Sequence, residues 1–203
     1  MDYPYVMRQA TLDDLDTVMS IVGERTDWLR ERGSDQWSGG SVYDRKFVRR
    51  VERGFTWVLE DLGTAIATVT LFQRCGSLLW TEQELREPSL FAWKLATAVD
   101  RGGQGLTGLL YRWGQDFAAA NGLDWIRWTV HGPSHGLRAY YSKLGAEEVR
   151  TVQPPDGPAI ALFQLRTQRV PEVAKRIVTH HAPMTAPSWH AAEERGIAVP
   201  VGA

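Results

Sequence analysis

The sequence predicts a mixed α+β fold in which helices cover a central sheet. Segments with apolar residues at helical spacing alternate with segments in which apolar and polar residues alternate one by one. The chain of 203 residues is 43% hydrophobic and 23% charged, which is the balance of a folded globular protein. The elements follow in the order β, α, α, β, β, β, α, β, α, β, β, which is typical of a mixed sheet with helices packed on it.

The N-terminal half contributes the first strand, two helices and a hairpin. Residues 3–9 predict a strand, and Thr11 is placed to cap a helix over residues 12–30. A second helix is predicted over residues 42–53. From residue 55 the period changes to two, and the turn Asp61-Leu62-Gly63 joins two antiparallel strands, residues 55–60 and 65–72. Residues 76–88 are predicted to be irregular.

The C-terminal half begins with a strand over residues 91–99 whose odd-numbered residues are predicted to share one face. An amphipathic helix follows from Leu106 and ends near Asn121-Gly122. A strand (125–130), a helix (135–144) and a closing hairpin (147–152 and 159–165) complete the domain. Residues 1–165 are therefore predicted to form one domain. The proline-containing residues 166–203 form a C-terminal extension, with a helix near 172–178, that packs on the domain or on a second subunit.

Charge and cysteine content exclude several classes of protein. The formal net charge is −1 without a sustained basic run, which argues against a nucleic acid or a membrane surface as partner. One cysteine, Cys75, allows no intrachain disulfide and fits a reducing compartment. No secretory signal and no membrane-spanning apolar window are found, so a cytoplasmic location is predicted. His180, His181 and His190 lack the spacing of a zinc site, so no metal is expected.

A glycine-rich loop follows the strand at 91–99 and opens the helix at Leu106. Its glycines stand at positions 102, 103, 105 and 108. Glycine lets backbone N–H groups turn toward one point, and a helix start adds unpaired donors and the positive end of a dipole. A diphosphate suits such a site, although left-handed turns alone also require glycine.

The next strand and helix extend this pattern, and together they resemble the GNAT acetyltransferase superfamily over about residues 5–165. The resemblance rests on an opening run at 8–15 and on three further motifs: Leu95-Ala96-Thr97, Gly103-Gln104-Gly105-Leu106-Thr107 and Ala139-Tyr140-Tyr141-Ser142-Lys143-Leu144-Gly145-Ala146. It implies a largely antiparallel mixed sheet that splays between its fourth and fifth strands, with helices on both faces. It also implies acetyl-coenzyme A as cosubstrate and an amine as acceptor.

The resemblance also implies roles for particular residues. The pantetheine arm would pair with the backbone of Leu95, Ala96 and Thr97, and Tyr141 would protonate the departing thiolate. A phenol suits that role, because its ordinary pKa of about 10 lies above the ~8.5 of a thiol. The remaining coenzyme-binding positions would be Gly102, Gly103, Gln104, Gly105, Leu106, Thr107, Gly108 and Ser134.

Four positions depart from the family pattern. Gly102 stands where the family has Gln or Arg, and Thr107 where it has Gly or Ala. Ser134 replaces a frequent Asn, and Ala146 replaces the usual Phe. The Thr107 side chain crowds a backbone that a phosphate approaches, while its hydroxyl offers a hydrogen bond.

The acceptor side is less well defined. Trp28 and Trp37 lie on the first helix and the loop after it, which form one wall of the acceptor site in this family; both are also candidates for packing residues. Glu82, Glu84 and Glu87 precede the fourth strand and are candidates for a general base or for surface carboxylates. The predicted acceptor is an amine of a small molecule, with a peptide amine and a homodimer left open. Two alternatives remain, a GNAT-fold binding module without catalysis and an enzyme that uses another acyl donor.

Overall fold

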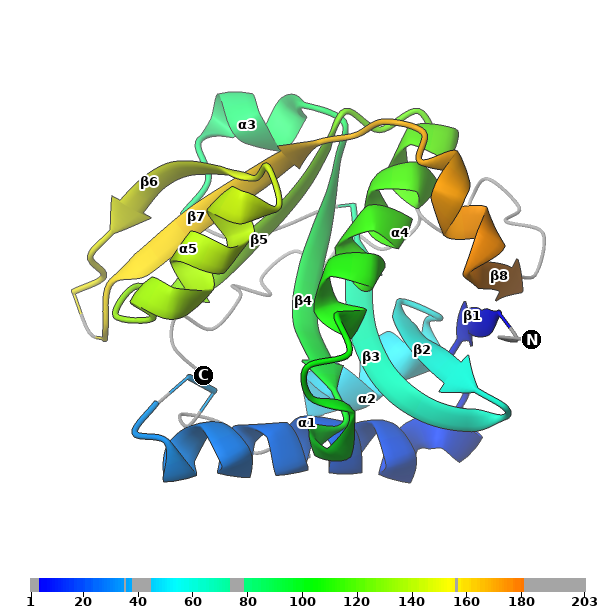
Figure 1. Cartoon of the computed structure of the whole chain (residues 1–203). Coiled ribbons are helices and arrows are strands. Elements are labelled where there is room, and N and C mark those ends of the chain that lie inside the picture. The colour runs from blue at the N-terminus through cyan, green and yellow to red at the C-terminus, as the bar shows by residue number, and fades with distance from the viewer. Residues whose placement is uncertain (1–3, 35, 38–44, 74–78, 156, 181–203) are drawn as a thin grey trace. The chain divides into compact units, whose positions relative to one another are not determined.

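Eight strands form one mixed sheet in the part of the chain that the structure describes, residues 4–34, 36–37, 45–73, 79–155 and 157–180. In this computed structural model the strand order is β6-β7-β5-β4-β3-β2-β1-β8 (Figure 1). The strands are β1 (Tyr5–Gln9), β2 (Thr56–Asp61), β3 (Thr64–Phe72), β4 (Ser89–Thr97), β5 (Trp125–His131), β6 (Glu147–Val152), β7 (Ile160–Arg166) and β8 (Ile177–His180). The helices are α1 (Leu15–Glu31), α2 (Arg45–Glu52), α3 (Glu82–Arg86), α4 (Leu106–Ala120) and α5 (His135–Lys143), with short 3-10 turns η1 (Leu12–Asp14), η2 (Val99–Arg101) and η3 (Pro171–Lys175). The predicted mixed α+β fold is confirmed.

Two compact units divide the chain. Unit 1 holds the described residues within Met1–Leu71, Trp93–Trp113 and Val170–Met184, and unit 2 those within Phe72–Ala92 and Gly114–Arg169. β4 and α4 each pass from one unit into the other. Among the described residues, no helix is long and apolar enough to cross a bilayer. Cys75 and the predicted start of the second helix at residues 42–44 lie outside the described residues.

The strands of unit 1 are joined by a tight hairpin. β2 pairs antiparallel with both β1 and β3, and β8 pairs parallel with β1. Leu62 and Gly63 connect β2 to β3 with left-handed φ angles of 49° and 81°. Two positive φ angles in a two-residue loop match the right-handed twist of the flanking strands. The predicted hairpin is therefore present.

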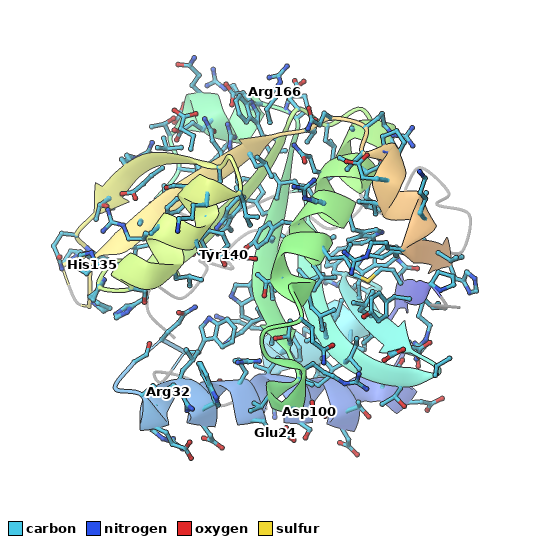
Figure 2. The ribbon with its side chains drawn as sticks, in the orientation of Figure 1. Glu24, Arg32, Asp100, His135, Tyr140 and Arg166 are labelled. Atoms are coloured by element: carbon cyan, nitrogen blue, oxygen red, sulfur yellow. The ribbon has the colours of Figure 1, made fainter. Side chains whose placement is uncertain are left out.

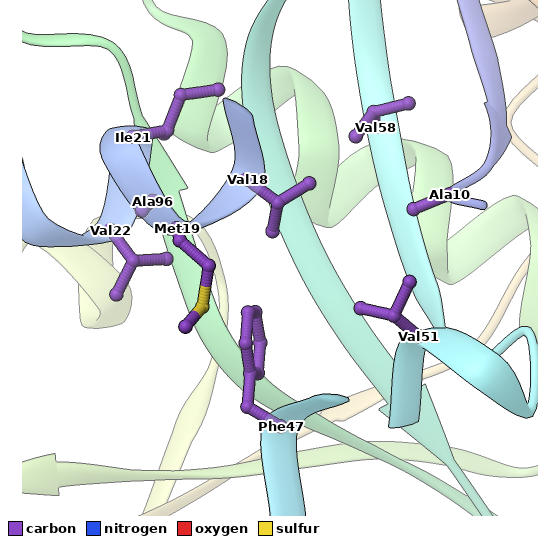
Figure 3. Packing of buried hydrophobic residues seen from close by; sticks show 9 residues of the cluster. All are labelled: Ala10, Val18, Met19, Ile21, Val22, Phe47, Val51, Val58 and Ala96. Carbon is purple, nitrogen blue, oxygen red and sulfur yellow. The ribbon is translucent and has the colours of Figure 1, made fainter. Parts of the chain in front are cut away.

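Helices cover both faces of the unit 1 sheet. α1 and α2 bury one cluster against β2 and β4, which Figure 3 shows around Met19, Phe47 and Val58. Trp57, next to Val58 on β2, places its ring 5.3 Å from that of Trp113 on α4. Neighbouring strand residues point to opposite faces, so α4 lies on the face opposite α1 and α2.

Unit 2 has the same two-sided arrangement. β4 pairs parallel with β5 at Ser89–Phe91, β5 pairs antiparallel with β7, and β7 pairs antiparallel with β6. A Cβ on Gly114 of α4 would lie 3.1 Å from Ile126, and Tyr141 of α5 packs 5.1 Å from Trp128. Ile126 and Trp128 share one face of β5, so both helices cover that face. Arg127, between them, donates to the Glu84 carbonyl of α3 on the other face.

The odd-numbered residues of β4 do not share one face throughout, which corrects the prediction for this strand. Trp93 and Ala96 both pack against the cluster under α1 and α2, although they are three residues apart. Lys94 lies between them with a left-handed φ of 51°. Such a residue breaks the period of two, so side chains after it exchange faces.

Two other predictions of secondary structure were wrong. Residues 82–86 form α3, where irregular chain was predicted. Thr81 caps this helix by accepting from the Glu84 N–H at 3.3 Å, while the Glu84 carboxylate accepts from the Thr81 N–H at 2.7 Å. A five-residue helix has too few apolar positions to show a period. The helix predicted near residues 172–178 is wrong in its extent: the 3-10 helix η3 ends at Lys175, and β8 begins at Ile177.

The C-terminal segment contributes to the core of unit 1. β8 pairs with β1 over Tyr5–Arg8, and the indole N–H of Trp113 donates to the Thr179 hydroxyl at 2.9 Å. Three apolar residues of this segment, Val170, Val173 and Ile177, are buried, while Val178 is exposed. The described part of the extension is therefore integral to the sheet.

Arg8 joins the first strand, the first turn and β2. Its guanidinium donates to both Asp14 carboxylate oxygens at 2.8 and 2.7 Å and to Glu60 at 2.6 and 2.9 Å. The hydrogen bonds from Arg8 lower the pKa of Asp14 to about 2, with further help from the Thr11 N–H. Asp14 therefore stabilises the fold only while it is ionised.

The first prediction concerns this ion pair. Asp14→Asn should lower the free energy of unfolding by about 1–2 kcal/mol at pH 7, a value reduced for partial exposure. The folded pKa lies below the ordinary 3.8, so the contribution is full above pH 4 and is lost as the pH falls toward 2. Urea unfolding from pH 7 to pH 2.5 measures this. Asp13→Asn, at an exposed carboxylate in the same turn, is the matched control; an equal loss for both variants would contradict the assignment.

The second prediction concerns β8. A chain ending after Arg166 should be less stable than one ending after His180 by at least about 3 kcal/mol, because it lacks three buried apolar side chains and the pairing with β1. Thermal and urea unfolding of the two truncated chains compare them directly. Equal stability would show that β8 is dispensable.

Candidate functional site

The loop between β4 and α4 has the geometry that its glycines predict. After Thr97, the Ala98 N–H donates to the Ile66 carbonyl of β3 at 2.8 Å, and η2 leads into the exposed residues 102–105. Gly103 and Gly105 have left-handed φ angles of 78° and 72°. Gly102 has an ordinary φ of −58°, so its backbone does not require glycine. Only two of these loop glycines are therefore needed for the shape of the turn.

α4 begins directly at this loop. The Leu109 N–H closes the first turn on the Gly105 carbonyl at 3.1 Å, and the buried Leu106 side chain holds the helix start in the core of unit 1. The first N–H groups of a helix have no carbonyl partner within it, and the dipole makes this end positive. Exposed glycines and free N–H donors at one helix start fit a diphosphate. The predicted positions Gly102–Gly108 are thus brought together.

The end of β4 is held by a residue that the sequence did not single out. Arg25 of α1 donates to the Thr97 carbonyl through Nε at 3.0 Å and Nη2 at 2.7 Å. It also donates to the Thr97 hydroxyl at 2.8 Å and to the Ala98 carbonyl at 3.1 Å. The Thr97 carbonyl, one of the predicted pantetheine partners, is therefore already occupied by two donors. A single arginine on a helix gives no sequence signal for such a contact.

Trp28 and Trp37, the predicted acceptor wall, each contact a cation beside the end of β4. The Arg25 guanidinium lies 5.0 Å and that of Arg32 3.9 Å from the Trp28 ring centroid. The ammonium of Lys94, which precedes Leu95, lies 5.0 Å from the Trp37 ring. The structure therefore places both indoles in unit 1, Trp28 beside the arginine that binds Thr97 and Trp37 beside Lys94.

In unit 2, Ser134 stands at the start of α5, which carries Tyr141. Ser134 precedes the helix, and its carbonyl accepts from the Arg138 N–H at 3.0 Å. Gly132 before it is required, because a Cβ there would lie 2.6 Å from the Ala159 carbonyl oxygen. His135 and Tyr140 of α5 are labelled in Figure 2.

Tyr141 lies in an aromatic cluster. Its ring packs 5.1 Å from Trp128, 5.6 Å from Phe163 and 5.7 Å from Tyr140, and it is 7% exposed. These contacts fix the ring on the face of β5 and β7. Tyr141 is therefore held in one orientation within its unit.

The carboxylates before β4 have structural partners. Arg150 binds Glu84 at 2.6 and 2.7 Å and lowers its pKa to about 2, and Arg127 pairs with Glu87. Glu82 pairs with Arg86 on the surface at 3.0 Å. Glu84 is a poor proton acceptor in this state, and all three side chains stabilise α3 and its surroundings. Within the described residues, no three His, Cys, Asp or Glu side chains form a group that could hold a metal; His181 and His190 lie outside them.

Known proteins share this architecture. No family model matches the chain. A curated protein, the uncharacterized N-acetyltransferase YesJ of Bacillus subtilis, is 25% identical over 145 residues, which cover 68% of this chain and 79% of that protein.

Solved structures agree on the fold. A GNAT acetyltransferase of Streptococcus agalactiae matches with a TM-score of 0.68 at 18% identity, over 81% of this chain and 96% of its own. A GNAT acetyltransferase of Listeria monocytogenes matches with a TM-score of 0.64 at 15% identity, over 80% and 94%. The spermidine N-acetyltransferase of Vibrio cholerae, solved with CoA and spermine, matches with 0.58 at 15%, over 80% and 95%. The chain therefore has the fold of GNAT acetyltransferases, and its sequence is similar to that of a curated N-acetyltransferase.

Proposed function

We propose that the chain transfers the acetyl group of acetyl-coenzyme A to an amine of a small molecule. The observation that carries this proposal is the run from β4 through exposed left-handed glycines into the start of α4. This arrangement offers backbone N–H groups and a helix dipole to a diphosphate without a metal ion. We assign the activity to residues 1–165, supported by β8 from the extension.

The residues of unit 1 would hold the coenzyme. The N–H groups of Gly103–Gly108 bind the diphosphate, and the Thr107 hydroxyl adds a donor beside them. The pantetheine arm lies along Leu95–Thr97 and pairs with backbone groups other than the Thr97 carbonyl, which Arg25 occupies. Gly102 contributes no side chain, so binding depends more on backbone than the family pattern implies.

The reaction forms one N–C bond and breaks one C–S bond. The neutral amine attacks the thioester carbonyl, and the thiolate departs with the coenzyme. One proton leaves the amine and one reaches the sulfur, so the protons balance. We assign the donation of the proton to the thiolate to Tyr141, which stands at the family's proton-donor position. Because Glu84 and Glu87 are bound to arginines, we assign the amine's proton to solvent.

The acceptor enters beside Trp28 and Trp37. Neighbours with this fold include an enzyme named for spermidine and one named for the alanine of ribosomal protein S18, so the fold accommodates both small and protein amines. Two indoles beside the end of β4 favour a small acceptor that contacts their faces. We further propose a cytoplasmic location, and the homodimer stays a prediction.

A coenzyme-binding module without catalysis is the second candidate. Thr107 and Gly102 in the loop favour it, because they depart from the family pattern at the diphosphate. Tyr141 at the family's proton-donor position favours the enzyme. An enzyme with another acyl donor would share the loop and differ only in the thioester it accepts.

The third prediction tests the loop. Acetyl-coenzyme A should bind the wild-type chain with micromolar affinity in a calorimetric titration. Gly105→Ala should weaken binding about tenfold, because alanine at a left-handed φ costs about 1–2 kcal/mol. Gly102→Ala is the matched control: its φ is ordinary and its Cβ meets only the Val99 carbonyl at 3.3 Å, so its effect should be smaller. No binding at millimolar coenzyme would remove the proposed function.

The fourth prediction tests the proton donor. Tyr141→Phe should lower kcat about 10- to 100-fold while the affinity for coenzyme A changes little, since the ring is kept and only the hydroxyl is lost. Tyr140→Phe, one residue before it on α5, is the control and should retain turnover. Thiol release with a panel of small amines measures both. An unchanged kcat for Tyr141→Phe would remove the general-acid role.

A further inference from the structure

Arg25 makes an unusual set of contacts for a helix arginine. All four of its hydrogen bonds go to neutral oxygens of two consecutive residues, Thr97 and Ala98. Arg25 forms no ion pair with any residue in the part of the chain that the structure describes. Glu24 and Arg32, labelled in Figure 2, mark the stretch of α1 that carries it.

The two residues that Arg25 contacts are the last of β4 and the first after it. The Ala98 N–H is bonded to β3, and the Thr97 and Ala98 carbonyls are bonded to Arg25. A buried backbone carbonyl without a hydrogen-bond donor destabilises the fold. The Arg25 side chain supplies the donors that a neighbouring strand would otherwise give to these two carbonyls. The direction in which the chain leaves β4 is thereby set.

The rest of the loop is anchored on the same unit. Arg101 of η2 donates to Asp61 at the end of β2 at 3.0 Å, and Leu106 is buried at the start of α4. Residues 102–105 between these anchors are exposed. Arg25 thus holds the backbone where this segment begins at Thr97 and Ala98, Arg101 holds it just before the exposed residues, and Leu106 holds its far end.

The plane of the Arg25 guanidinium is supported by Trp28, one turn further along α1, at 5.0 Å from the ring centroid. Arg32 lies on the same indole at 3.9 Å. A planar fork with several fixed partners loses little freedom on binding, which lysine cannot match. This support distinguishes Arg25 from a mobile surface arginine.

We propose that Arg25 is a positioning residue: by holding the Thr97 and Ala98 carbonyls, it keeps the Gly102–Gly105 loop in the shape that binds the coenzyme diphosphate. This inference rests on the proposed function for its ligand, and on the contacts of unit 1 for the loop itself. We assign Arg25 no contact with the reacting atoms or with the diphosphate. It acts through the backbone that precedes the loop.

The test compares Arg25→Gln with Arg8→Gln in the full chain. Arg8 also makes several hydrogen bonds in unit 1, but to Asp14 and Glu60 of η1 and β2, so it controls for lost stability alone. Amide hydrogen exchange of Ala98, Arg101 and Gly102, whose N–H groups are hydrogen-bonded in this structure, reports the loop, and titration with coenzyme A reports binding. Arg25→Gln should accelerate loop exchange and weaken coenzyme A binding, each about tenfold, the scale of one lost charge-assisted hydrogen bond. Arg8→Gln should leave both within about twofold.

Arg25→Lys provides a second variant if Arg25→Gln does not fold. It keeps the charge and one donor contact but loses the fork, so its loop exchange should lie between wild type and Arg25→Gln. Unchanged loop exchange in the Arg25 variants, or equal acceleration in Arg8→Gln, would overturn the inference. The exchange data decide the role of Arg25, whereas titration of the wild-type chain decides the proposed function. If the wild-type chain does not bind coenzyme A but loop exchange still depends on Arg25, the proposed function is removed and the positioning role of Arg25 stands.

Discussion

The candidate site depends on how β4 satisfies its backbone hydrogen bonds. Its first residues pair with β5 at Ser89–Phe91, and its last are completed by β3 and by Arg25 of α1. A strand inside a sheet needs hydrogen-bond partners for its backbone along both edges. Where a neighbouring strand ends, another group must supply the missing hydrogen bonds. Arg25 is that group at Thr97. These hydrogen bonds at the end of β4 set the direction in which the following loop begins.

A few residues with left-handed φ angles shape β4 and the loop that follows it. Gly103 and Gly105 turn the loop without steric cost, whereas Lys94 adopts the same region with a side chain. A non-glycine residue there costs of order 1–3 kcal/mol and persists only where its surroundings hold it. The Lys94 ammonium lies near the rings of Trp37 and Trp93, and Trp93 itself packs on the core cluster. The backbone change at Lys94 explains why Trp93 and Ala96 meet the same helices.

Local patterns predicted most elements, and non-local contacts account for what was missed. The amphipathic α4, the β2–β3 hairpin with its Leu62-Gly63 turn and the glycines before α4 all carry signals within a few residues. α3 depends instead on a capping box and on Arg150, which lies 66 residues from Glu84. β8 is a strand because β1 offers it an edge. Arg25 reaches Thr97 across 72 residues, so no spacing within the sequence indicates the pair.

In both units, arginine side chains donate hydrogen bonds to backbone carbonyls, but the arginines of unit 2 also bind carboxylates. In unit 2, Arg127 and Arg150 donate to the Glu84 and Leu79 carbonyls and also bind Glu87 and Glu84. Arg25 meets only neutral oxygens, so its positive charge is not cancelled by a contact carboxylate within the described residues. An uncancelled charge at the base of the loop adds to the positive end of the α4 dipole. The same side chain that shapes the loop therefore also makes its surroundings favourable to an anion.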